Sequence, residues 1–162
     1  MHRHILIPTD GSELAEHAVT NGLSLAKSLG AKVSVITVVE ESFDWRPRFV
    51  NAESPWLSVP ETGVSQWQDP DTLAKYNEHI EKYAAIVLSR AAAAAKQAGV
   101  PCETMQVANA RPYQAIIATA ADRGCDLIVM SSHGRGGLSA VVLGSVTNKV
   151  LTHTKTPVLV CR

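Results

Sequence analysis

The sequence predicts an α/β fold in which a parallel β-sheet carries helices on both faces. Short apolar, β-branched runs alternate with longer segments of helical periodicity along most of the 162 residues. Several helical segments end in glycine, a typical helix stop, and the next apolar run follows within a few residues. Strict alternation of strand and helix requires parallel strands joined by right-handed crossovers.

The first half of the chain contributes two strands and two helices. Residues 4–10 form a short apolar run that stops at a proline and a polar turn. Residues 12–30 follow with near-helical apolar spacing and a terminal Gly30. Residues 32–40 are apolar and β-branched without alternation, which is typical of a strand buried on both faces. Residues 71–100 predict a long helix by propensity, again ending in glycine.

The second half continues the alternation with three strands and two helices. The predicted strands are 102–108, 126–131 and 157–161, and the predicted helices are 112–124 and 145–154. In sheets of this kind, ligands bind beyond the carboxyl ends of the strands, where the strand order reverses. The loops after the first and fourth strands are therefore where we expect a binding site.

Residues 41–70 form an irregular insertion in what we otherwise predict to be one domain, residues 1–162. The insertion holds four of the eight prolines, all three tryptophans and both phenylalanines. Irregular loops of this length are usually functional or disordered, and disordered segments are poor in aromatic residues. The insertion therefore either packs its tryptophans on the protein's own surface, or forms a lid over the ligand site or a patch for a partner.

Charge and composition argue against several classes of protein. Fifteen Lys and Arg balance fifteen Asp and Glu, which argues against a nucleic-acid partner and gives no reason to expect an anionic membrane surface. No apolar run has the length of a bilayer span, and the N-terminus does not match a signal peptide, so we expect a cytoplasmic protein. The three cysteines are widely spaced, which favours neither a disulfide framework nor a zinc site.

The segment after the fourth predicted strand has the pattern of a phosphate site. Its glycines permit tight turns and close approach of a ligand to the backbone, and Ser145 is placed to be the N-cap of the next helix. A helix start presents unpaired N–H groups and the positive end of the helix dipole, which together attract phosphate. The glycines of the turn are Gly134, Gly136 and Gly137, and the candidate hydroxyl donors are Ser132, Ser145 and Thr147.

Two standard phosphate-binding motifs do not match this segment. The pattern GxxxxGK[ST] fails because no lysine follows a glycine here. GRGGLS nearly matches GxGxxG, but Ser139 replaces the last glycine and the segment follows the fourth strand instead of the first. We therefore predict that main-chain amides at two facing bends, and not a lysine, bind the phosphates.

The spacing Ser131-x2-Gly134-x9-Gly144-Ser145 carries a family resemblance. The chain resembles the universal stress protein family, whose nucleotide-binding members have G-x2-G-x9-G-[S/T] after the fourth strand. The segments PTDGS, DLIVMSSHGRGGLS and LGSVTNKVLTHTKTPVLV are also similar to the family's usual segments. The likeness covers nearly the whole chain outside the insertion, and the long spaced motif is more specific than the likeness in fold.

The resemblance implies a flavodoxin-like, Rossmann-like three-layer sandwich with a five-stranded parallel sheet of order 3-2-1-4-5, and a site for ATP or AMP. It implies that Asp10 contacts the adenine or the ribose. The residues implied beside it or in the adenine pocket are Pro8, Thr9, Val38 and Met130. The residues implied at or close to the ribose and phosphates are Ser131, Ser132, His133, Gly134, Gly144, Ser145, Val146 and Thr147. Family members often use a divalent ion, which suits Mg²⁺ bound mainly by phosphate and water.

The final predicted strand, 157–161, lies at the edge of the sheet. A short apolar edge strand invites pairing with another copy of itself. The resemblance points the same way, since these proteins commonly dimerise through the last strand. We therefore expect a twofold homodimer, with a further protein partner that the sequence does not identify.

Several residues keep more than one interpretation. Asp10 is either a cap or turn residue for the following helix or a ligand contact, and the two roles are compatible. His133 is expected in a structural or phosphate-adjacent role because no nucleophile or orienting partner accompanies it, and Arg135 either reaches a phosphate or is solvated. Ser131 stands at a family glycine and costs of order 1 kcal/mol if positive φ is required there. Ala110 also replaces a common glycine, and both changes would weaken phosphate binding or favour AMP.

We therefore expect a cytoplasmic stress-response regulator that binds ATP or AMP as a homodimer, without catalytic residues or a dedicated metal site. One alternative is a slow ATP-hydrolysing or nucleotide-transferring enzyme, which needs a charged group at the phosphates, where the sequence offers only Arg135 and His133. The other is a nucleotide-free protein-interaction module in which Ser131 disables the site.

Overall fold

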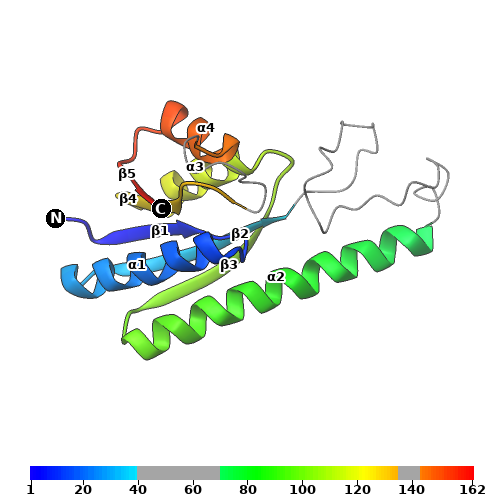
Figure 1. Cartoon of the computed structure of the whole chain (residues 1–162), viewed down its shortest axis with the longest axis horizontal. Helices are drawn as coiled ribbons and strands as arrows, with labels where there is room; N and C mark the ends of the chain where they lie inside the picture. The colour runs from blue at the N-terminus through cyan, green and yellow to red at the C-terminus, as the bar shows by residue number, and fades with distance from the viewer. Residues whose placement is uncertain (40–69, 135–142) are drawn as a thin grey trace.

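The computed structural model describes residues 1–39, 70–134 and 143–162. Within these ranges, five strands and four helices alternate in the predicted order (Figure 1). The strands are β1 (His4–Pro8), β2 (Lys32–Val39), β3 (Cys102–Ala108), β4 (Leu127–Ser131) and β5 (Val158–Cys161). The helices are α1 (Glu13–Leu29), α2 (Pro70–Ala98), α3 (Pro112–Asp122) and α4 (Ser145–His153).

The five strands form one sheet with β1 at its centre. All neighbouring strands are parallel, and the order β3-β2-β1-β4-β5 confirms the predicted order 3-2-1-4-5. Ile5 of β1 pairs with Val33 of β2 on one side and with Leu127 of β4 on the other. The strand order therefore reverses at β1, and the turns after β1 and β4 leave the sheet side by side.

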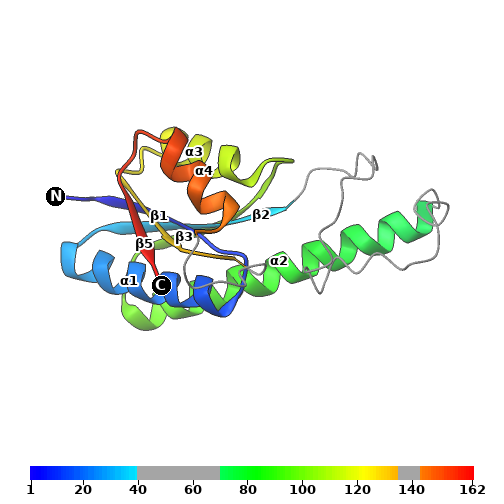
Figure 2. The ribbon, with the colours of Figure 1, turned by 45° about the horizontal axis from the view of Figure 1, so that its top comes forward.

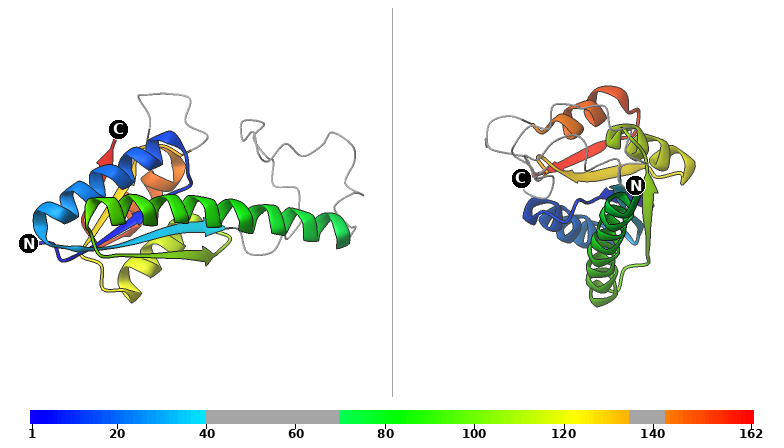
Figure 3. Two further views of the ribbon diagram at one scale, coloured as in Figure 1. Left: turned by 90° about the horizontal axis from the view of Figure 1, so that it is seen from below. Right: turned by 90° about the vertical axis from the view of Figure 1, so that its right-hand side faces the viewer.

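Helices cover both faces of the sheet. The helices α1 and α2 pack on one face, and α3 and α4 pack on the other (Figure 2 and Figure 3). Along β1, Ile5 and Ile7 belong to the core under α1 and α2, whereas Leu6 belongs to the core under α3 and α4. Burial on both faces accounts for the uninterrupted apolar run of this strand.

Capping residues determine where α1 begins and ends. The hydroxyl of Ser12 accepts a hydrogen bond from the amide of Ala15 at 3.3 Å, so Ser12 is the N-cap. Gly30 follows the helix with φ 65°, which confirms the predicted glycine stop. The first strand also stops at its proline, as predicted: β1 ends at Pro8, and in the polar turn that follows, the Asp10 carboxylate accepts a hydrogen bond from the amide of Ser12.

The helix α2 is 29 residues long, and its amino-terminal half extends past the sheet (Figure 1). It begins at Pro70, one residue before the predicted start and inside the predicted insertion 41–70. Residues 40–69 lie outside the described ranges, so the expectation for the insertion stays a prediction. Of the helices in the described ranges, none combines the length and apolar character that a bilayer span requires.

The three cysteines carry free thiols. Cys125 and Cys161 are buried among the apolar residues of the two cores, and Cys102 is half-buried. Burial raises the pKa of the Cys125 thiol to about 11, so this group stays protonated at neutral pH.

His4 is a buried polar residue at the start of the central strand. Its Nδ1 lies 3.1 Å from the carbonyl oxygen of Arg123, and a carbonyl only accepts, so Nδ1 carries the proton. The hydroxyl of Ser34 donates to Nε2 at 2.8 Å, so both ring nitrogens are satisfied in the neutral form. Burial, and after it the charge of Lys32, lowers the pKa of His4 below its ordinary value of 6.5.

We expect His4 to make the protein less stable as the pH falls below about 6.5. The pKa of His4 is lower in the folded state than in the unfolded chain, so the unfolded chain takes up the proton first and acid favours unfolding. The free energies of unfolding of the wild type and His4→Asn should therefore converge as the pH is lowered from about 7.5 to about 5. Urea denaturation measures both. A difference that stays constant over this range would contradict the assignment.

Candidate functional site

The turn after β1 is fixed by short-range hydrogen bonds. Oδ1 of Asp10 accepts from the amide of Ser12 at 3.0 Å and from its hydroxyl at 2.6 Å. The hydroxyl of Thr9 accepts from the amide of Gly11 at 3.2 Å, and the amide of Thr9 donates to the carbonyl of Ile36 at 2.8 Å. Oδ1 of Asp10 therefore stabilises the turn, and Ser12 caps α1. A contact of Asp10 with a ligand would be made by the second carboxylate oxygen.

That second oxygen, Oδ2 of Asp10, faces Gly134 in the loop after β4. A Cβ added to Gly134 would lie 2.6 Å from Oδ2, closer than such atoms approach one another. The turn after β1 and the loop after β4 are therefore in direct contact, as the predicted strand order requires. Only glycine leaves room for the carboxylate in its present place.

Gly144 closes the other side of this arrangement. Its amide donates to the carbonyl of Ser132 at 2.8 Å, and an added Cβ would lie 3.2 Å from that oxygen and 3.3 Å from Cα of His133. The hydroxyl of Thr147 donates to the carbonyl of Ser131 at 2.9 Å. The start of α4 is therefore attached to the end of β4. We call Asp10, residues 132–134 and residues 144–147 together the switch-point cluster.

The start of α4 differs in one detail from the prediction. The predicted N-cap Ser145 is wrong, because the N-cap is Gly144, which has extended backbone (φ −58°, ψ 153°) and whose carbonyl accepts from the amide of Asn148. Ser145 is the first helical residue, and no side chain caps the helix. The amides of the first three helical residues, Ser145, Val146 and Thr147, therefore lie outside the helical hydrogen-bond ladder.

The remaining predicted site residues divide into a buried and an accessible set. Val38 and Val146 are half-buried and pack against the core that contains Met130. Pro8, Asp10, His133 and Gly144 are also partly exposed, and Gly134 and Ser145 are exposed. The buried members, which support the cluster from beneath, are Thr9, Met130, Ser131, Ser132 and Thr147.

Ser131, at the position of a family glycine, lies in ordinary strand backbone. It is the last residue of β4 and pairs with Cys161 of β5 in parallel register. Extended backbone does not require glycine, so the cost of order 1 kcal/mol that positive φ would impose does not arise. Ser131 is only 8% exposed, so it lies beneath the cluster surface.

Of the two basic residues predicted in the loop, His133 and Arg135, the structure describes His133. Nδ1 of His133 lies 3.1 Å from the hydroxyl of Ser132, and the residue is half-buried in the cluster. Arg135 lies outside the described ranges, so its predicted alternatives stay open. Ala110 is exposed in the turn between β3 and α3.

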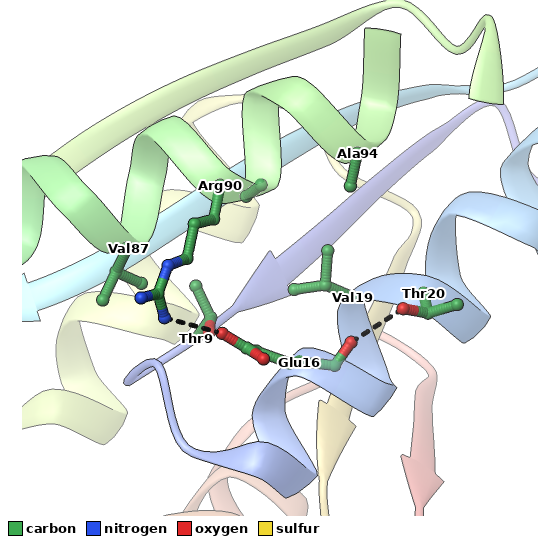
Figure 4. Close-up of a pocket in the computed structure, with 8 residues that line it drawn as sticks. Thr9, Glu16, Val19, Thr20, Val87, Arg90 and Ala94 are labelled. Carbon is green, nitrogen blue, oxygen red and sulfur yellow. Dashed lines mark hydrogen bonds and ion pairs between the residues drawn. The ribbon is translucent and has the colours of Figure 1, made fainter. Parts of the chain in front are cut away.

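Sequence reasoning missed Tyr83, which reaches the cluster from the middle of α2. Its hydroxyl donates to the carbonyl of Asp10 at 3.1 Å. The same helix is attached to α1 by an ion pair between Arg90 and Glu16, whose atoms lie 3.2 Å apart (Figure 4). The sequence carries no signal for this contact, because Tyr83 is 73 positions away from Asp10. The helical spacing of α2 indicates only which of its side chains share a face.

A cavity of about 210 Å³ lies between α1 and α2, on the side of Thr9 (Figure 4). Its walls are mainly small or apolar, and Glu16 and Arg90 lie at its rim. The residues that line it are Thr9, Glu16, Val19, Thr20, Val87, Arg90, Ala91 and Ala94. Among the described parts of the chain, no group of three His, Cys, Asp or Glu residues is placed to hold a metal ion.

Comparisons with known proteins agree with this architecture. The model of the universal stress protein family matches residues 1–46 and 50–162. Universal stress protein YxiE of Bacillus subtilis is 29% identical over 162 residues, with both chains covered in full. Universal stress protein MJ0531 of Methanocaldococcus jannaschii is 28% identical, and the match covers this chain in full and 83% of the relative.

Solved structures share the fold. That of protein MJ0577 of Methanocaldococcus jannaschii has a TM-score of 0.70 at 25% identity, covering 99% of this chain and 96% of its own. A universal stress protein in complex with cAMP has a TM-score of 0.61 at 23% identity, with coverage of 98% and 95%. One from Archaeoglobus fulgidus in complex with dAMP has a TM-score of 0.61 at 16% identity, with coverage of 100% and 98%. The likeness to the last two establishes the fold alone.

Gly11→Ala should lower the free energy of unfolding by about 2–4 kcal/mol. Gly11 has φ 74°, and an added Cβ would lie 2.5 Å from both Oη of Tyr83 and Cγ2 of Val87. Gly30→Ala is the matched control, because Gly30 has φ 65° with no heavy atom within 4 Å of the added carbon. The control should lose only the backbone contribution of about 1 kcal/mol. Urea denaturation compares the two, and equal losses would contradict close packing of α2 on the turn.

Proposed function

The chain belongs to the universal stress protein family, and from this premise we propose that it is an adenine-nucleotide-binding regulatory protein of the stress response. ATP or AMP would bind at the switch-point cluster. One observation carries the proposal: two glycines bring the loop after β4 against the Asp10 carboxylate and against the start of α4.

The start of α4 suits the phosphates. The amides of Ser145, Val146 and Thr147 lie outside the helical ladder, no side chain caps them, and the helix dipole is positive at this end. Such amides bind an anion without any basic side chain. Because the amide of Gly144 is already paired with Ser132, the contribution of Gly144 is its small size, which lets the two backbones approach.

The nucleoside suits the opposite side of the cluster. Oδ2 of Asp10 belongs to a carboxylate, which only accepts hydrogen bonds, and adenosine offers donors at the ribose hydroxyls and the adenine amino group. Val38 and Val146 add partly exposed apolar surface on which a planar base can pack. The expected order along the ligand is therefore nucleoside at Asp10 and phosphates at α4.

The relatives with bound ligands support adenine as the base. One universal stress protein of this fold was solved with cAMP and another with dAMP, and both ligands are adenine nucleotides. A Mg²⁺ ion would accompany the phosphates of ATP. Since the described residues contain no group that could ligate a metal on its own, phosphate oxygens and water would supply most of its ligands.

A regulatory role follows from the chemistry of the cluster. Phosphoryl transfer depends on charged groups placed at the transferred phosphate. The described cluster offers backbone amides, hydroxyl groups, one carboxylate and the imidazole of His133; Oδ1 of the carboxylate is engaged in the turn, and Nδ1 of His133 lies 3.1 Å from the Ser132 hydroxyl. Binding without turnover can act by favouring one conformation of the surface that a partner protein meets.

We also propose a homodimer through β5. The carbonyls of Pro157 and Cys161 accept from the amides of Ile128 and Ser132, so residues 157 and 161 face β4. Backbone groups alternate between the two edges of a strand, which directs those of Val158 and Val160 to the open edge. Leu159 is 43% exposed, so pairing with a second copy would also cover apolar surface.

Purified wild-type protein should bind AMP and ATP in calorimetric titrations, and Gly144→Val should weaken both by at least about tenfold. A side chain at this position forces the start of α4 away from residues 132–133, since even a Cβ would lie 3.2 Å from the Ser132 carbonyl oxygen. Gly124→Ala is the control for a side chain added at a glycine before β4: an added Cβ there has no heavy atom within 4 Å, and the strain at its φ of 62° affects stability and not the cluster. The control should keep its affinity within about twofold.

Ser131→Gly separates this proposal from the nucleotide-free alternative. Because Ser131 lies in extended backbone, glycine relieves no strain there, and the affinity for AMP should stay within about threefold of the wild type. Binding by Ser131→Gly but not by the wild type would establish that serine disables the site. If neither protein binds AMP or ATP, the proposed function is wrong.

Leu159→Lys should convert the dimer to a monomer, because a lysine on an edge strand opposes pairing with a second copy. Light scattering after size exclusion measures the mass of each protein. The expected masses are two chains for the wild type and one for the variant, with unchanged circular dichroism. A wild type that is monomeric at all concentrations would contradict the proposed dimer.

A further inference from the structure

We propose that Tyr83 of α2 is a positioning residue, which holds the Asp10 turn in the conformation that binds the nucleotide. The inference rests on the proposed function for its ligand. Its structural basis is the hydrogen bond from the Tyr83 hydroxyl to the Asp10 carbonyl oxygen, 3.1 Å long, which joins residues 73 positions apart. Tyr83 is not expected to touch the nucleotide and would act through Asp10.

The packing of α2 against the turn makes this contact specific. The side chains of Tyr83 and Val87, one helical turn apart, lie against Gly11, where an added Cβ would be 2.5 Å from each of them. Gly11 has φ 74°, a conformation that side-chain-bearing residues rarely adopt. The peptide that joins Asp10 to Gly11 is therefore held on its carbonyl side by a hydrogen bond and next to its amide side by close packing.

The neighbouring surface contributes little to holding the turn. The cavity of about 210 Å³ lies between α1 and α2 beside Thr9, and at the cavity the ion pair of Arg90 with Glu16 joins the two helices (Figure 4). Both partners of this pair are at least half exposed, with side-chain exposures of 66% and 50%, so solvent screens it. Tyr83 and Val87, in contrast, contact the turn directly from α2.

Fixing the carbonyl of Asp10 also orients its carboxylate. Oδ1 is held by the amide and hydroxyl of Ser12, and this leaves Oδ2 directed at Gly134. Without the Tyr83 hydroxyl, the peptide after Asp10 gains rotational freedom, and the carboxylate moves with it. The nucleoside would then meet a less well ordered acceptor, at a cost in affinity.

The test compares Tyr83→Phe with the wild type in calorimetric titrations of AMP and ATP. Phenylalanine keeps the ring against Gly11 and removes only the hydroxyl. We expect both affinities to fall by about three- to tenfold, the effect of one lost hydrogen bond. Their ratio should stay within about twofold, because Asp10 acts on the nucleoside that the two ligands share. Ser89→Ala removes another hydroxyl hydrogen bond of α2, the one that Ser89 donates to the carbonyl of Ile86 on the exposed side of the helix, and as the control it should keep both affinities.

A second comparison tests whether Tyr83 acts through Asp10. In the background of Asp10→Ala, adding Tyr83→Phe should change the AMP affinity by less than about twofold, because the group that Tyr83 positions is gone. Equal effects of Tyr83→Phe in the two backgrounds would overturn the positioning role and indicate an independent effect on folding.

A third measurement needs no nucleotide. Hydrogen exchange by NMR should show the amides of Gly11 and Ser12 exchanging several-fold faster in Tyr83→Phe than in the wild type, with amides of β2 unchanged. Unchanged exchange at the turn would overturn the inference, whatever the affinities. If exchange is faster in Tyr83→Phe but the wild type binds neither AMP nor ATP, Tyr83 stabilises the turn and the proposed function is wrong.

Discussion

The structure depends on the burial of β1 from both faces of the sheet. Ile5 and Ile7 are enclosed by one pair of helices and Leu6 by the other, so no polar side chain is tolerated in the middle of the strand. After this apolar middle, the next polar residues are Thr9 and Asp10, just past the end of β1. Because the order of strands reverses at β1, this end lies beside the loop after β4, and the polar groups of both meet there.

Much of the fold was predictable because its signals are local. The order of strands and helices follows from hydrophobic periodicity, and the stop at Gly30 follows from the left-handed conformation that glycine adopts readily. The end of β1 follows from its proline and the polar turn after it. The N-cap of α4 was misassigned by one residue, because serine is the better cap by side-chain chemistry but Gly144 is the residue that fits against Ser132.

The part of the site that was predictable is the part that the spaced glycine motif identifies. At Gly134 a side chain would meet the Asp10 carboxylate, and at Gly144 it would meet main-chain atoms. Both positions therefore favour glycine, which a sequence motif can record. Ser131, in contrast, lies in strand backbone where several residues fit. Tyr83 lay beyond prediction, since its role arises from a contact between elements far apart in sequence, and no local pattern records which side chain of a helix meets a distant turn.

The contact at Tyr83 lies near the middle of a helix of 29 residues. Tyr83 lies thirteen positions after Pro70, about 20 Å along the helix at 1.5 Å per residue. A bend of about 10° just before Tyr83 would displace the beginning of the helix by about 3.5 Å, while Val87, Ala91 and Ala95 stay buried against the sheet. The contact with the Asp10 turn thus lies at the boundary between the packed part of α2 and the part that extends past the sheet, where a small angular change has its largest effect on the distant end of the helix.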